Sequence, residues 1–153
     1  MEFPRPEVDI LSPPAGFDEL AEWFERWSTR LVLLEEYPLG DVRRAILVVE
    51  RAVREHRQRF DPWASALPRE DAAVARGVQI LLSDHAWFET SIAQLWWFYD
   101  VVDREDHGGH RQALGQFGRV FAEALGRHRA DERRLEALVP KRVALASPAS
   151  KQP

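Results

Sequence analysis

The sequence lacks several features that assign proteins to common functional classes. None of its 153 residues is cysteine, which excludes disulfides, thiolate catalysis, and zinc or iron–sulfur sites ligated by cysteine. It contains no glycine-rich phosphate loop, no nucleophile elbow and no β-like alternation of apolar and polar residues. These absences favour an all-α protein over the α/β enzyme folds.

Signals for export and for membrane insertion are also missing. No run approaches the roughly 18 apolar residues of a membrane span. The first seven residues carry acids and prolines in place of the basic and apolar regions of a secretory signal. We therefore expect a cytoplasmic protein that does not associate with membranes.

The charge balance argues against nucleic-acid binding. The formal net charge is −4, whereas binding to phosphates usually needs a basic face. One arginine-rich stretch, residues 127–136, is interspersed with glutamates, a pattern typical of a solvated helix face. We expect no nucleic-acid partner.

Composition and length indicate one globular domain with flanking segments. Hydrophobic residues make up 45% and charged residues 30% of the chain, enough apolar surface to offset the entropy cost of folding. Residues 1–16 are rich in proline, which lacks an amide donor and favours extended backbone. We expect an extended arm over 1–16, a folded domain over 17–139 and a flexible C-terminal tail over 140–153.

Four stretches of the central domain show the apolar spacing of amphipathic helices. They cover about 17–37, 41–60, 70–105 and 110–139. Asp41 is a plausible N-cap, Pro62 and Pro68 bracket the second connection, and the Gly108–Gly109 pair allows a tight reversal before the last helix. Short connections place neighbouring helices antiparallel. The sequence predicts an up-down-up-down four-helix bundle.

Three of the five histidines fall on the inward stripes of these helices. They are His56, His85 and His128, whereas His107 and His110 lie at the predicted reversal. In an antiparallel hairpin that turns near residues 106–107, residues whose numbers sum to about 213 lie at the same height. We therefore expect His85 and His128 to face each other.

Acids accompany two of these histidines at the spacing that brings side chains together on a helix. Glu89 lies four residues after His85, and Glu132 lies four residues after His128. Iron, manganese and zinc accept imidazole nitrogen and carboxylate oxygen together, and a bundle interior supplies both. The alternative is a set of neutral, hydrogen-bonded core histidines with ordinary surface pairs.

The motifs around these histidines resemble those of hemerythrin-like, His-His-Glu four-helix bundles. The stretch Arg54–Trp63 is similar to the family's second-helix motif, with His56 in the ligand position. Ser83–Glu89 resembles the third helix, with His85 as first ligand, and His128–Glu132 resembles the fourth. The resemblance covers residues 17–139 and implies a pair of bridged irons that bind dioxygen.

The sequence departs from this family pattern at three points. Phe60 replaces the second-helix glutamate, Glu89 stands where a second histidine is common, and the first helix has no histidine. We therefore expect either a single-metal or altered site that uses His56, His85, Glu89, His128 and Glu132, or a retained fold that has lost its metal. The metal would be iron or another divalent ion such as manganese or zinc.

An unusually dense group of aromatic residues lies on the third predicted helix, between Trp87 and Tyr99. The group cannot all face one way, so part of it must face outward. The N-terminal arm covers the excess in one interpretation, and a homodimer forms through it in the other.

Three functions follow from these observations. The first is metal binding with dioxygen binding or sensing, and the second is a metal-free interaction module. The third is an enzyme with a metal centre, which would need an open coordination position and a substrate cavity.

Overall fold

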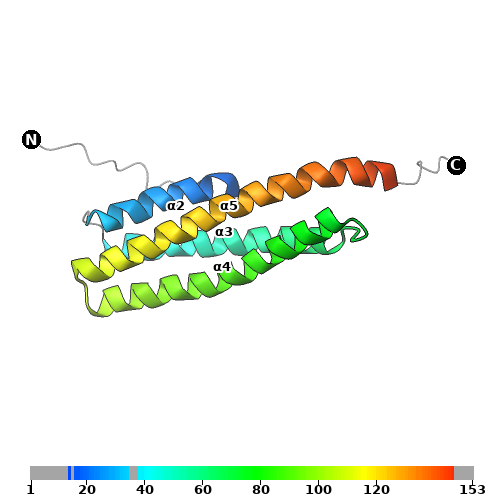
Figure 1. Ribbon diagram of the computed structural model, residues 1–153. Helices are drawn as coiled ribbons and strands as arrows, with labels where there is room; N and C mark the ends of the chain where they lie inside the picture. Colours follow the sequence, from blue (N-terminus) through cyan, green and yellow to red (C-terminus); the bar gives the residue numbers. More distant parts are fainter. Residues whose placement is uncertain (1–13, 15, 35–37, 147–153) are drawn as a thin grey trace, which may run out of the picture.

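In a computed structural model of the protein, four antiparallel α-helices form one bundle (Figure 1). The structure describes Pro14, residues 16–34 and residues 38–146, with side-chain surroundings through residue 139. The helices are α2 (Phe17–Val32), α3 (Leu39–Ser65), α4 (Ala72–Arg104) and α5 (Gly108–Ala146). Within these ranges there is no β-strand. The predicted up-down-up-down bundle is confirmed.

The structure describes only part of the two flanking segments. The predicted N-terminal arm, apart from Pro14 and Gly16, lies outside the described residues, as do residues 147–153. Helix α5 runs to Ala146 and therefore passes through Pro140, where we had placed the start of the tail. Proline removes one amide donor from a helix but leaves the other backbone groups able to pair.

Proline also failed to end the second helix where the sequence suggested. Pro62 lies inside α3, which continues to Ser65. The Pro62 carbonyl still accepts a hydrogen bond from the amide of Ala66 at 3.2 Å, so only the missing amide donor is lost. The extra turn carries Asp61 into the bundle as a helical residue.

Two other boundaries differ from the prediction for local reasons. Helix α2 ends at Val32, before Leu34, which has a left-handed backbone (φ 58°) and is 48% exposed; such a residue ends helices. Gly108 belongs to the first turn of α5 instead of the reversal. The His107 side chain caps that turn by accepting the Gly109 amide at 3.0 Å.

The core is divided into two apolar clusters. The larger one joins all four helices and contains Phe24, Trp27, Ile46, Leu95 and Phe121 among others. The smaller one is built by the far ends of α3, α4 and α5, around Leu81 and Leu135. Helix α2 is short and covers only the first half of α5, whose C-terminal part projects beyond it (Figure 1). The start of α2, at Phe17, lies beside two polar residues of the bundle interior, His56 and Glu132.

Helix α2 packs unusually close to α5 because two glycines face it. A Cβ atom added at Gly115 would lie 2.6 Å from the Ser28 carbonyl oxygen and 2.9 Å from the Val32 nitrogen. Gly118 lies against the Ser28 side chain in the same way. The absence of side chains at these positions therefore allows backbone to approach backbone.

Part of the aromatic group on α4 does face outward, as predicted. Trp97 is 55% exposed and Trp87 is 40% exposed, whereas Phe88 is buried. The homodimer remains a prediction. Separately, none of the described helices combines the length and apolar character needed to cross a membrane.

Candidate metal centre

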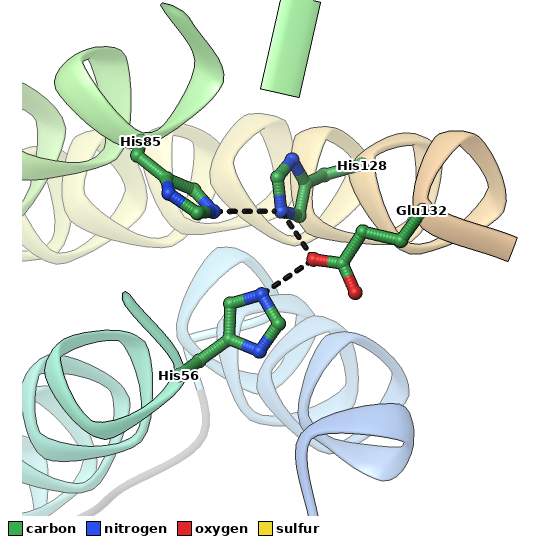
Figure 2. A group of neighbouring side chains, drawn as sticks. All are labelled: His56, His85, His128 and Glu132. Atoms are coloured by element: carbon green, nitrogen blue, oxygen red, sulfur yellow. Dashed lines mark hydrogen bonds and ion pairs between the residues drawn. The ribbon is translucent and has the colours of Figure 1, made fainter. Parts of the chain in front are cut away.

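Three histidines and one glutamate converge between the two apolar clusters (Figure 2). His56 comes from α3, His85 from α4, and His128 and Glu132 from α5. Each offers one ligand atom, and these atoms all lie within 4.8 Å of one another. His85, His128 and Glu132 are buried, with exposed fractions of at most 1%. The four side chains form a group that can hold a metal ion.

The deeper half of this group is the pair His85 and His128. Their Nε2 atoms lie 3.1 Å apart, which confirms that the two residues face each other. Each ring is held from behind by a carboxylate: Asp61 Oδ1 lies 2.5 Å from His85 Nδ1, and Asp84 Oδ2 lies 2.9 Å from His128 Nδ1. Carboxylates on the outer nitrogen are the usual means of orienting metal-binding histidines.

These carboxylates decide which nitrogen carries the proton. An ionised carboxylate can only accept a hydrogen bond, so the Nδ1 atoms of His85 and His128 donate to Asp61 and Asp84. In the neutral rings both Nε2 atoms are then unprotonated and point at each other across 3.1 Å. Two facing lone pairs repel unless a cation, either a proton or a metal ion, lies between them.

Glu132 places a third acceptor atom next to the Nε2 atoms of His85 and His128. Its Oε1 atom lies 2.6 Å from His128 Nε2 and also contacts His56 Nε2. Neither Oε1 nor His56 Nε2 makes a hydrogen bond of good geometry, although both are buried. The second oxygen, Oε2, accepts from Arg129 at 2.8 Å. Arg129 therefore leaves one oxygen of Glu132 directed at the histidines.

Burial and neighbouring charges set the protonation of the group. Burial lowers the pKa of His85, and repulsion from His128 adds to this effect. Burial also opposes charge on His128, but its close contacts with the carboxylates of Glu132 and Asp84 outweigh this effect, so the pKa of His128 is raised. Burial would raise the pKa of Glu132, yet its contacts with His128 and His56 lower it to about 2. Of the two facing rings, His128 therefore takes up a proton more readily than His85.

Aromatic rings enclose the group. Phe17 stacks on His56 with ring centroids 3.9 Å apart, Phe60 lies edge-on to His85 at 5.3 Å, and Phe88 lies edge-on to His128 at 5.1 Å. A pocket of about 500 Å³ reaches His56 and Glu132 from the surface and is lined by Phe17, Phe60 and Trp63 among others. The pocket therefore reaches the side chains of His56 and Glu132, although their Nε2 and Oε1 atoms are buried, and it does not include the His85–His128 pair.

One predicted ligand lies elsewhere. Glu89 is not part of the group; its side chain is 72% exposed and pairs with Arg57 at 2.8 Å. Glu89 lies one helical turn beyond His85, at the level of the larger apolar cluster. A carboxylate that turned inward there would be buried without a partner. Glu89 instead remains at the surface, where it pairs with Arg57. The other four predicted residues, His56, His85, His128 and Glu132, are brought together.

Sequence reasoning missed the two carboxylates behind the histidines. Asp61 follows the predicted end of the second helix, next to Pro62, and Asp84 directly precedes His85, so neither falls at the four-residue spacing that identified Glu132. The available signal was an acid on each predicted helix close to the height of the facing histidine. To identify these acids, one would need to know where α3 ends and how α4 is rotated about its axis.

The ligand set suits one ion, not two. Helix α2 contributes Phe17 to the group and no ligand. Phe60 occupies the side of α3 that faces His85. The space that a second ion would need is therefore lined by aromatic rings.

Comparison with known proteins adds no relative: no protein family, no curated protein and no solved structure matches the chain.

Proposed function

We propose that this protein binds one divalent transition-metal ion through the Nε2 atoms of His56, His85 and His128 and the Oε1 atom of Glu132. The observation that carries the proposal is the convergence of acceptors: two Nε2 atoms oriented by carboxylates, and a buried Glu132 oxygen without a proper hydrogen bond. A metal ion satisfies all of them at once. Imidazole with carboxylate is a ligand set suited to first-row transition metals.

The dimensions of the group support this proposal. Ligand bonds of about 2.0–2.1 Å in a tetrahedral site place neighbouring ligand atoms about 3.3 Å apart. The four atoms already lie within 4.8 Å of one another. Small side-chain rotations suffice to centre an ion, and Asp61, Asp84 and Arg129 fix three of the four ligands from behind.

The use of the metal depends on its identity. Zinc would be saturated by four protein ligands in a structural site. Iron or manganese accepts more ligands, and a further position would face the pocket beside His56 and Glu132. We propose iron, with dioxygen or a comparable small molecule as the ligand of that position. The resemblance to hemerythrin-like bundles supports this choice, with one iron in place of two.

Elemental analysis of untagged protein, purified without chelators and also reconstituted with Fe²⁺, Mn²⁺ or Zn²⁺, tests the metal site. We expect about one equivalent of metal in the natural protein and in Glu89→Gln. The His85→Ala/His128→Ala variant should lose it. The His107→Ala/His110→Ala variant is the matched control, because it removes the same number of histidines near the start of α5, away from the group.

The visible spectrum of the Fe²⁺ protein before and after exposure to air tests the dioxygen proposal separately. A new absorption band that depends on His56 and Glu132 would support it. Stoichiometric metal without any spectral change would restrict the function to metal binding. Metal far below one equivalent, not restored by reconstitution, would contradict the site and favour the metal-free interaction module.

A further inference from the structure

A second hollow lies along the seam between α3 and α4, away from the pocket beside Glu132. Its volume is about 620 Å³, within the range typical of sites for small molecules. Its apolar wall is formed by Val53, Pro62, Ile92, Ala93 and Trp96. We call this hollow the α3–α4 groove.

Ion pairs occupy both ends of the groove. At one end, Glu50 accepts from Arg54 at 3.2 Å and from the Trp96 indole nitrogen at 3.2 Å. At the other end, Arg57 reaches across from α3 to Glu89 on α4 at 2.8 Å. An apolar surface bounded by charged groups fits a molecule that has an apolar body and a charged end.

The two partners of the Arg57–Glu89 pair are not equally held. Glu89 is 72% exposed, so it can turn into water at little cost. Arg57 is 35% exposed and also donates to Asp61 at 3.4 Å, and Asp61 is fixed in turn by His85. An incoming anion therefore has to displace only Glu89. An incoming cation would have to displace Arg57 from two carboxylates.

We propose that the α3–α4 groove binds a small amphipathic monocarboxylate, whose carboxylate replaces Glu89 on Arg57 and whose apolar body lies against Val53, Ile92 and Trp96. Arginine suits this role because its planar guanidinium pairs with a carboxylate through two parallel hydrogen bonds. This site takes a different ligand from the metal group, and the two are linked only through Asp61, which contacts both Arg57 and His85.

Titration of metal-free protein with octanoate, followed by NMR shifts and calorimetry, tests the proposal. Octylammonium is the ligand of opposite charge, and acetate is the ligand without an apolar body. We expect octanoate to bind with a Kd of about 1 mM or below. Octylammonium and acetate should bind at least about tenfold more weakly.

Substitutions should change octanoate affinity in opposite directions. Arg57→Gln should weaken binding about tenfold, whereas Glu89→Gln should strengthen it roughly two- to fivefold because it removes the competing carboxylate. The controls Arg51→Gln and Glu55→Gln change exposed residues of α3 outside the groove and should leave the affinity unchanged.

A third substitution changes the volume of the groove without changing its charge. Ala93 is exposed and lines the groove, so Ala93→Leu should fill it without disturbing the fold and should block octanoate. This result keeps the proposal testable if Arg57→Gln does not fold. Equal binding of octanoate and octylammonium, unchanged octanoate affinity in Glu89→Gln and Ala93→Leu, or no octanoate binding would overturn the proposal.

Discussion

At the scale of single residues, the acids behind the histidines determine what the candidate centre can do. Asp61 and Asp84 hold the Nδ1 protons of His85 and His128, so both inner nitrogens are available as ligands. Without these acids a buried histidine could equally present its protonated nitrogen to the centre. The ligand geometry of His85 and His128 therefore depends on Asp61 and Asp84 as well as on the two histidines.

The first prediction concerns Asp84. Asp84→Asn keeps a hydrogen-bond acceptor for His128 Nδ1 but removes the negative charge, so His128 becomes a poorer ligand. We expect the affinity for Zn²⁺ or Fe²⁺ to fall about 10- to 100-fold. Competition with a chromophoric chelator measures this change. Asp100→Asn, an exposed position on the same helix, is the control, and an equal loss in both variants would contradict the role of Asp84.

The second prediction concerns protons. The pKa of His128 is raised. At a pH near the ordinary pKa of histidine, this ring therefore still carries a proton, which a metal ion must displace. Metal affinity should therefore rise by up to about tenfold per pH unit below the pKa of His128 and level off above it. Calorimetry between pH 6 and 8, in buffers of different ionisation enthalpy, measures the proton released. Affinity independent of pH in this interval would contradict the prediction.

Residue spacing predicted part of this centre and not the rest. The facing of His85 and His128 follows from helix geometry alone, because two antiparallel helices with one short turn have a fixed register. Glu89 and Glu132 share the same spacing from a histidine, yet only Glu132 lies in the group. Their difference depends on Arg57 and Arg129, which lie on helix faces that the sequence did not resolve.

At the scale of elements, helix ends were less predictable than helix centres. Apolar periodicity located all four helices, but Pro62 lies within α3 because a helix near its end can lose one amide bond. The consequence is functional: the continued helix positions Asp61 against His85. A connection starting at this point would have left that histidine without its acid.

The third prediction concerns the contact between α2 and α5. Gly115→Ala would place a methyl group 2.6 Å from the Ser28 carbonyl oxygen and 2.9 Å from the Val32 nitrogen. Backbone atoms cannot rotate away, so the helices must separate. We expect the free energy of unfolding to fall by about 1–3 kcal/mol, as measured by urea denaturation.

Gly126→Ala is the matched control for this substitution. Gly126 lies in the same helix and has nothing within 4 Å of an added Cβ. Alanine should stabilise the helix there by up to about 1 kcal/mol because of its higher helix propensity. Stabilisation by both substitutions would show that α2 does not approach α5 as closely as described.

At the scale of the whole molecule, the polar group lies between two apolar clusters. The larger cluster includes α2, while the smaller is formed by α3, α4, α5 and the α3–α4 connection, which contributes Leu67. The four proposed ligands come from these last three helices. A bound ion would therefore link the helices at the level where the bundle changes from four helices to three, and where the core has polar atoms instead of apolar contacts.

The fourth prediction follows from this position. An ion that binds only the folded protein stabilises it by about 2.7 kcal/mol at a free concentration of one hundred times its Kd. For a chain of this size we expect Tm to rise by roughly 5–10 °C, as measured by circular dichroism. The rise should persist in His107→Ala/His110→Ala and disappear in His85→Ala/His128→Ala. Because the second variant also removes buried side chains, the decisive quantity is the difference in Tm with and without metal for each variant. A shift retained after loss of His85 and His128 would place the stabilising ion elsewhere in the molecule.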